Sequence, residues 1–318
     1  MGYRIRRVAA IIPTMLLASL IIFGLMRILP GDVATMILIG PHGDGEANSE
    51  DVARVRQELG LDHSLPVQYI DWLAGIARLD VGKSLRSDRP VFSELLFRIP
   101  VTLELGLMAS VISLLIAVPL GTIAAVKRGT WIDYGARIFA IGGLSVPNFW
   151  VGMLIILFLV SYFGWTPPVG YANFFEDPWK NIQQLIFPAL ALGYQQAGLV
   201  SRLIRSSLLE VMSEDYVRTA RAKGLAERTI VIKHALRNSM LPVITVIGVG
   251  LAGIVGGTVI IETVFTLPGL GRLLRDAITS RDYPVVQTLV FLFAFVFAFM
   301  SLVIDLAYSV LDPRIRIT

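Results

Sequence analysis

VTLELGLMASVISLLIAVPLGTIAAV, residues 101–126, contains one charged side chain, that of Glu104. A helix of about 20 mostly apolar residues is long enough to cross the hydrocarbon core of a bilayer. Such a helix satisfies its backbone hydrogen bonds internally, which lipid cannot do for it. We therefore expect this stretch to be a membrane span and the chain to be a membrane protein.

The composition of the whole chain supports this interpretation. Of its 318 residues, 55% are hydrophobic and 16% are charged, whereas soluble domains carry about 25% charged residues. The absence of cysteine excludes disulfides and cysteine-ligated metal sites. The net charge of +4 is modest and the basic residues are not gathered on a soluble domain, so we expect no nucleic-acid partner.

Five segments have the length and hydropathy of a span, and a sixth is weaker because it contains Gln195, Gln196 and Arg202. The first segment is too long for a signal peptide and no small-residue cleavage site follows it promptly, so we interpret it as an uncleaved anchor. The sequence thus predicts an all-α integral membrane protein with six transmembrane helices. The clear spans are residues 8–29, 101–126, 138–163, 240–265 and 285–310, and the weaker one is 185–204.

The spans divide the chain into three parts. Residues 1–29 form an N-terminal transmembrane helix, residues 30–98 an insert, and residues 99–318 a five-helix core with a charged loop at about 209–237. Within the insert, Asn48 resembles a helix cap and Gly60 a helix stop, and a second helical pattern starts at Val67. We expect the insert to be a small helical cap.

Lysine and arginine predict the orientation. The side that holds residues 1–7, 127–137, 202–237 and 309–318 carries 16 of them in 64 residues, and the other side carries 11 in 111. Positive charge is retained on the cytoplasmic side of membrane proteins. We therefore expect both termini and the 209–237 loop in the cytoplasm, and the insert on the extracytoplasmic face.

Signatures of catalysis are missing from the sequence. Gly82-Lys83-Ser84 resembles the end of a phosphate-binding loop, but Ala77 stands where that loop needs glycine, and the triplet falls on the outer side. Three histidines occur, with neither H-E-x-x-H nor G-x-S-x-G. We expect no enzyme activity and no metal site in this chain.

The charged loop contains DYVRTARAKGL, residues 215–225. Ser213 can cap a helix here and Gly224 can end it. Tyr216, Val217 and Ala220 share one side at helical spacing, and the small residues of the stretch let another protein approach the backbone closely. An ordinary amphipathic connector is the alternative interpretation.

Four further features of the spans are candidates for function. Pro147 is expected to kink the third span, and Asn148 beside it could line a pathway. Glu262 lies near the outer end of the fifth span, where either a gate or substrate-facing role or a hydrogen-bonded structural role is open. Gly253 and Gly257 allow close helix contact, with a partner chain or within this one.

YVRTARAKGL at residue 216, followed by HALRNSMLPV at residue 234, resembles the coupling loop of permease subunits of ATP-binding-cassette (ABC) importers of the dipeptide, oligopeptide and nickel subgroup. The family's general E-A-A-x-x-x-G pattern is matched here only by Ala220 and Gly224, with Arg218 and Thr219 in the leading positions. Five other segments resemble that subgroup in its order: LPGD at 29, GKSLRSDRPV at 82, SVPNFW at 145, ETVFTLPGLGRLLRDAITSRDYPVVQ at 262 and LDPRIR at 311.

The resemblance implies a type I ABC importer permease fold in a bacterial-type inner membrane. It implies a second homologous permease subunit, two cytoplasmic ATPase subunits and an extracytoplasmic substrate-binding protein as partners, with membrane lipid around them. ATP and Mg²⁺ would be held by the ATPases, and this chain would bind no cofactor. The implied docking residues are Tyr216, Val217, Arg218, Thr219, Ala220, Arg221, Ala222, Lys223, Gly224 and Leu225.

Dipeptides or oligopeptides are the substrates that the resemblance favours. A nickel or glutathione importer of the same family is the alternative within it. A self-contained secondary transporter is the alternative from a different class, and it would be expected to carry midplane charge pairs or discontinuous spans in matched halves.

Overall fold

The computed structural model describes residues 2–28, 34–35, 38, 48–58, 60–168 and 170–311. Helices dominate this part of the chain, and the β structure found in it is one isolated bridge between Lys83 and Pro90. The chain divides into two compact units. Unit 1 comprises residues 1–100 and 269–299, and unit 2 comprises residues 101–268 and 300–318.

In unit 1, aromatic side chains join the first helix to the insert. The unit contains α1 (Gly2–Ile28), α3 (Ser49–Glu58), α4 (Leu65–Ala77) and α14 (Leu270–Thr279), with parts of α5 (Val91–Val126) and α15 (Tyr283–Leu311). The ring of Phe23 lies 5.4 Å from that of Tyr69, and Trp72 contacts Phe291 edge-on at 5.9 Å. The Ser19 and Tyr69 hydroxyls are hydrogen-bonded at 2.8 Å. α3 and α4 lie in the range predicted for the insert, and α4 packs on both α1 and α15.

Ser84, in the triplet that resembles a phosphate loop, forms a long-range contact within unit 1. Its hydroxyl donates to Asp282 Oδ2 at 2.5 Å, and the Leu85 amide donates to the other oxygen of that carboxylate at 3.2 Å. Ser84 and Asp282 are both buried. Since a buried carboxylate needs hydrogen-bond donors, this pair ties the insert to the turn before α15.

Unit 2 is built around α8 (Pro178–Val211), which contacts most other helices of the unit. Its early part packs Leu185 against Leu105 and Phe265, and its later part packs Ile204 against Val243. The unit also holds α6 (Trp131–Ser145), α7 (Asn148–Phe163), α9 (Asp215–Ala222), α10 (Glu227–Thr229), the π-helix η1 (Ile230–Ala235), α11 (Leu236–Ser239), α12 (Leu241–Gly257) and α13 (Val259–Val264).

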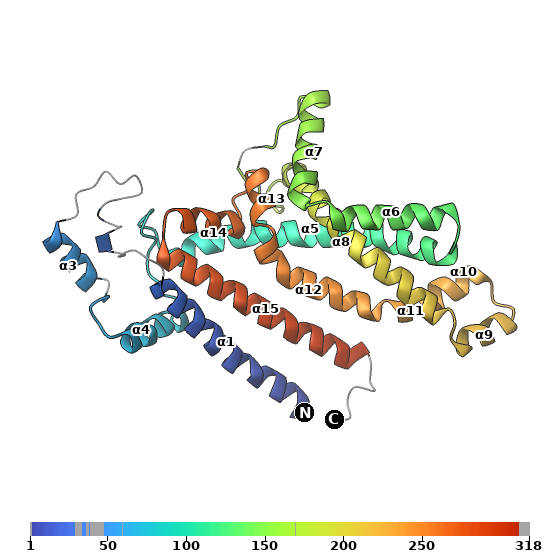
Figure 1. The fold of residues 1–318 in the computed structure, drawn as a ribbon, viewed down its shortest axis with the longest axis horizontal. Coiled ribbons are helices and arrows are strands. Elements are labelled where there is room, and N and C mark those ends of the chain that lie inside the picture. The colour runs from blue at the N-terminus through green and yellow to red at the C-terminus, as the bar shows by residue number, and fades with distance from the viewer. Residues whose placement is uncertain are drawn as a thin grey trace. The chain divides into compact units, whose positions relative to one another are not determined.

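Two glycines of α8 let its neighbours approach closely. A Cβ at Gly193 would lie 2.8 Å from the Ala109 carbonyl oxygen of α5, and a Cβ at Gly198 would lie 2.7 Å from the Ala140 oxygen of α6. Small residues at such crossings are the usual way in which membrane helices gain packing contact. Helices α5, α6 and α8 consequently form one closely packed group within unit 2 (Figure 1).

The third predicted span, residues 138–163, is broken rather than continuous. α6 ends at Ser145, α7 begins at Asn148, and the two helices meet at 102° (Figure 1). Proline disfavours helical backbone at the residue before it, and Val146 has an extended ψ of 124°. The kink expected at Pro147 is therefore present, and it is a full break between two helices.

The structure also bears on the number of spans. Among the described residues, three helices are long and apolar enough to cross a membrane, within α1, α5 and α15, and five if each bent helix pair counts as one span. One such pair is α6 with α7, and the other bends by 50° ahead of α12. α8 contains the weaker expected span, 185–204, and has ample length, but it carries polar residues. The all-helical class is confirmed, and the count of six stays a prediction.

Candidate functional site

The site predicted from sequence is α9, which lies at one end of unit 2 beside α10 and α11 (Figure 1). Its N-cap is Glu214, with extended backbone and no side-chain capping bond. The expectation that Ser213 caps it is wrong, since that hydroxyl donates to the Glu210 carbonyl at 2.6 Å, in the turn that follows α8. Asp215 occupies the first turn, where the helix dipole favours negative charge.

One face of α9 is buried against its own chain. Val217 is fully buried and Ala220 is 8% exposed, and both pack on Ile230 of η1 with Met212 beside them. The sequence predicts that Val217 and Ala220 share one side of the helix and that small residues such as Ala220 let another protein approach. The expected shared face exists, but this chain covers it, so the small size of Ala220 serves internal packing.

Polar contacts hold α9 in the same position. The Asn238 amide donates to the Tyr216 hydroxyl at 2.8 Å, and that hydroxyl donates to the His234 carbonyl at 3.4 Å. Arg221 donates to both carboxylate oxygens of Glu227, at 3.1 and 2.7 Å. The Arg221 guanidinium lowers the pKa of Glu227 below its ordinary value. These contacts connect α9 to α10, η1 and α11.

Gly224 ends α9 through its backbone conformation. Its φ is +77°, a left-handed value that glycine adopts without steric cost. The Gly224 amide donates to the Arg221 carbonyl at 2.9 Å, and the Leu225 amide donates to the Ala220 carbonyl at 3.3 Å. A Cβ added at Gly224 would meet no atom within 4 Å. Conformation, rather than space, is therefore what this position requires within the chain.

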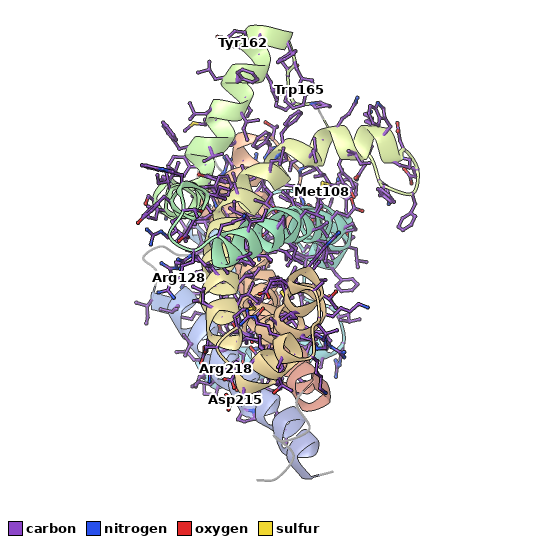
Figure 2. The ribbon with its side chains drawn as sticks, turned by 90° about the vertical axis from the view of Figure 1, so that its right-hand side faces the viewer. Met108, Arg128, Tyr162, Trp165, Asp215 and Arg218 are labelled. Atoms are coloured by element: carbon purple, nitrogen blue, oxygen red, sulfur yellow. The ribbon has the colours of Figure 1, made fainter. Side chains whose placement is uncertain are left out.

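The opposite face of α9 is exposed. By helical spacing it comprises Asp215, Arg218, Thr219 and Ala222, and all four side chains are exposed. Figure 2 labels Asp215 and Arg218, which form an ion pair at 3.3 Å. Lys223 and Leu225 beyond the helix are also exposed. We name Asp215, Arg218, Thr219 and Ala222 the outer face of α9.

The connection from α9 to the core of unit 2 runs through η1. Ile230 packs on α9, while Val231 and Ala235 of the same π-helix pack on Leu208 at the end of α8. π-Helices are rare and are frequently found at functional sites. A displacement of α9 would therefore move η1, and through η1 the end of α8, because the three elements are packed in contact.

Pro147 and Asn148 lie at the break between α6 and α7. Pro147 is exposed, and the Asn148 amide donates to Gln195 Oε1 of α8 at 3.2 Å. The next residue, Gln196, has a side-chain nitrogen that is buried and makes no hydrogen bond in the described structure. The structure thus brings one of the residues that weakened the sixth predicted span, Gln195, together with Asn148, whereas the Gln196 side chain faces Gly250 of α12.

Glu262 is fully buried in α13. Its Oε1 accepts from the Thr102 hydroxyl at 2.8 Å and from the Thr258 hydroxyl at 2.9 Å. Ile261 and Phe265 beside it belong to the apolar core with Leu105. In this arrangement the carboxylate faces hydrogen-bond donors rather than an opening. This geometry fits the hydrogen-bonded structural role of Glu262 rather than a gate or substrate-facing role.

Glu104, the charged residue of the 101–126 span, binds the segment that leads from α7 into α8. It accepts hydrogen bonds from the Tyr171 hydroxyl and the Asn181 amide, each at 2.7 Å. Asn181 also donates to the Ala172 carbonyl at 2.9 Å. Burial, with a contribution from the Glu104 carboxylate, raises the pKa of Tyr171 above its usual range.

Gly253 and Gly257 both lie in α12. A Cβ at Gly253 would meet no atom within 4 Å, so this position is not in close helix contact within the described chain. The surroundings of Gly257 lie outside what the structure describes. Contact with a partner at this pair stays a prediction.

The residues that hold α9 in place were not among those predicted from the sequence. Asn238, Ile230 and Glu227 follow α9 in the chain, but their roles depend on how the chain folds back after Gly224. Asn238 lies within HALRNSMLPV, the second half of the quoted loop signature. The resemblance of that stretch to the family's loop marks Asn238 as part of the site, but it does not predict the contact with Tyr216.

Comparison with known proteins identifies relatives over the whole length. The family model described as binding-protein-dependent transport system inner membrane component matches residues 117–317, and the N-terminal model of such membrane components matches residues 1–106. A protein of Brucella abortus (strain 2308), assigned as the permease of a peptide transport system, is 41% identical over 312 residues, which is 98% of each chain. The glutathione transport system permease GsiC of Salmonella choleraesuis is 40% identical over 316 residues, which is 99% of each.

Among solved structures, the fold is similar to a chain of the MetNI methionine ABC transporter in an inward-facing conformation. The TM-score is 0.54 at 18% identity, and the likeness covers 69% of this chain and 96% of that one. A second crystal form of the same transporter gives a TM-score of 0.57 with the same coverage.

Proposed function

The chain belongs to the family of binding-protein-dependent transport system inner membrane components, as a permease of the peptide and nickel subgroup of ABC importers, and from that membership we propose how it couples and what it carries. It is a multi-pass membrane protein. Our proposal is that ATP-driven movement of separate cytoplasmic ATPase subunits reaches the spans through α9, and that the cargo is a short peptide. Under the predicted orientation, α9 lies on the cytoplasmic side.

One observation carries the coupling proposal: α9 is packed on its own chain by one face and exposed by the other. Val217 and Ala220 bind it to η1, while the outer face is left open. A short helix presented in this way suits a groove on a partner. Because η1 also contacts Leu208 of α8, the packing offers a rigid connection by which partner movement could reorient helices.

Two relatives support a peptide cargo. The Brucella relative is assigned to peptide transport and the Salmonella relative to glutathione transport. Glutathione is itself a tripeptide derivative, so peptide bonds are common to both. Asn148 and Gln195 at the α6–α7 break offer amide groups that could hydrogen-bond a peptide backbone. Glutathione is the second candidate, and the 40% identity to its permease favours it over nickel.

The test is uptake by the reconstituted importer. The chain would be co-expressed with the second permease and ATPases from its own operon, and proteoliposomes would be supplied with the binding protein. We expect ATP-dependent uptake of labelled dipeptide or tripeptide, and inhibition of it by unlabelled peptide. Uptake of glutathione or Ni²⁺ with no competition by peptide would refute the peptide assignment. Uptake by this chain alone, driven by an ion gradient, would instead refute the importer coupling.

Coupling is tested separately with the outer face. Ala222→Trp should reduce uptake and ATPase binding while the purified chain keeps its melting temperature, because Ala222 is exposed. Lys233→Trp is the matched control, since Lys233 is exposed on η1 within the same loop. Undiminished uptake in the Ala222 variant would contradict docking through this face.

A further inference from the structure

A pocket of about 190 Å³ lies between α5, α6 and α8, apart from α9. Its walls come from the late part of α5, one face of α6 and the late part of α8. Three of its residues are arginines, and most of the others are apolar. The arginines are Arg137, Arg202 and Arg205, and the apolar residues include Leu120, Ala124, Ala140, Ile141 and Leu144.

The pocket has a basic end and an apolar end. Near the start of α6, Asp133 binds Arg205 of α8, whereas further along α6 Gly143 meets Tyr194. α6 and α8 are therefore antiparallel here, and the arginines lie toward the start of α6. Ile141 and Leu144 follow Arg137 at helical spacing, so they lie on the same face toward the other end.

The charge at the basic end is not neutralised. Asp133 accepts from Arg205 through both carboxylate oxygens, at 2.7 and 2.9 Å, and so offsets that arginine. Arg137 lies over the Tyr134 ring at 4.7 Å, a contact that leaves its positive charge in place. Arg202 forms no ion pair with any residue that the structure describes. Two guanidinium groups are thus available beside an apolar wall.

The apolar end is accessible from outside the helix group. Ile141 is 59% exposed and Leu144 is 38% exposed. Gly121 of α5 lets α8 approach closely beneath the pocket, since a Cβ there would lie 2.6 Å from the Ser201 carbonyl oxygen. In a membrane protein this apolar opening faces either lipid or another subunit. Arg137 and Arg202 are exposed, and the predicted orientation puts them at the cytoplasmic edge of the spans, where anionic head groups attract basic side chains.

We propose that this pocket binds an anionic phospholipid. The phosphate oxygens accept hydrogen bonds from Arg137 and Arg202, and an acyl chain lies along Leu120, Ile141 and Leu144. Asp133 holds Arg205 in place at the rim, so that the basic end keeps its shape. The chemistry matches the basic pockets between membrane helices that bind lipid head groups. A free anion would leave the apolar half uncovered, which is why a phospholipid is the occupant.

The experiment measures phospholipid retained by the full-length chain. Protein purified in mild detergent from a membrane of phosphatidylethanolamine and phosphatidylglycerol would be washed, and the bound lipid quantified by mass spectrometry. We expect phosphatidylglycerol to be enriched over its membrane fraction. Arg137→Gln with Arg202→Gln should lower that enrichment at least fivefold, and Ile141→Trp, which fills the apolar half, should lower it comparably. Absence of enrichment in the wild-type chain would overturn the proposal.

Lys127→Gln with Arg128→Gln is the matched control, because it removes two exposed charges from the nearby α5–α6 turn, where Figure 2 labels Arg128. This control should keep the wild-type enrichment of phosphatidylglycerol. A loss of enrichment equal to that of the Arg137/Arg202 variant would show that positive charge anywhere near the membrane, and not this pocket, retains the lipid. Displacement by inorganic phosphate alone would show an anion site without lipid. Loss of the second permease from the Arg137/Arg202 variant, with lipid retention unchanged, would make the pocket a subunit interface. Each of these three outcomes overturns the proposal.

If the double variant proves unstable, the wild-type chain in phosphatidylethanolamine nanodiscs provides the readout. Added phosphatidylglycerol should raise its melting temperature more than added phosphatidylcholine does, and equal shifts would contradict the proposal.

Discussion

Asn238 donates a hydrogen bond of 2.8 Å to the hydroxyl of Tyr216, across 22 residues of chain. The two residues join α9 to α11, so the candidate docking helix and the segment leading into α12 are held by one side-chain contact. The hydroxyl in turn donates to the His234 carbonyl. The coupling role proposed for α9 requires firm attachment to the rest of the chain, and this bond is part of that attachment.

Removing this bond should weaken coupling. Tyr216→Phe and Asn238→Ala should each lower peptide uptake per ATP hydrolysed several-fold, because a net hydrogen bond is worth about 1 kcal/mol. The double variant should be no worse than Tyr216→Phe alone, since that variant already removes both hydrogen bonds of the hydroxyl. The measurement is uptake and ATPase activity of the reconstituted importer. Additive losses would show that the two residues act separately.

Ala220 and Ala222 should respond differently to the same enlargement. Ala220→Leu inserts a side chain between Val217 and Ile230, and overpacking of that kind costs about 1–3 kcal/mol. Ala222→Leu points outward and should leave stability within about 0.5 kcal/mol of wild type. Thermal unfolding of the detergent-purified chain, compared with its binding to the ATPases, separates the two effects. Equal melting temperatures for both variants would contradict the packing of α9 on η1.

Substitutions at Gly224 should follow backbone conformation rather than size. The φ of +77° favours Gly, is tolerated best by Asn among other residues, and is poor for Ala and worse for Val. We expect uptake to fall in the order Gly, Asn, Ala, Val. If a partner instead requires a small residue at this position, Ala should transport better than Asn. Uptake rates of the four proteins at equal expression decide between these orders.

The Asp133–Arg205 pair should be needed for stability. Asp133 is buried and Arg205 is largely so, with side chains 3% and 20% exposed. Removing one partner of such a pair leaves an uncompensated charge, with a cost of about 3 kcal/mol. Asp133→Asn and Arg205→Met should each lower the melting temperature, and the double variant should recover part of the loss. As a comparison, Asp215→Asn breaks an exposed pair with Arg218 and should change little.

Local pattern accounts for much of what could be predicted. The apolar stretch at 101–126 lies within α5, residues 285–310 lie within α15, and residues 215–222 form a helix followed by a left-handed glycine. Each of these depends on residues close together in sequence. The membership of the peptide and nickel subgroup was predicted from ordered motifs and is confirmed by relatives over the whole chain.

Contacts between distant segments could not be predicted in this way. Helical spacing put Val217 and Ala220 on one face, but only the folded chain shows that Ile230 covers that face. Pro147 predicted a kink, while packing determines that α6 and α7 diverge by 102°.

By itself, then, the sequence determined the helical class and the positions of the long apolar helices and of α9, because propensity and hydropathy act over one element at a time. Only the tertiary structure decided which face of α9 is open, that Ser84 binds Asp282 198 residues away, and that Arg137 and Arg202 share a pocket. Those outcomes depend on which surfaces meet when the helices pack, and no local pattern encodes that choice.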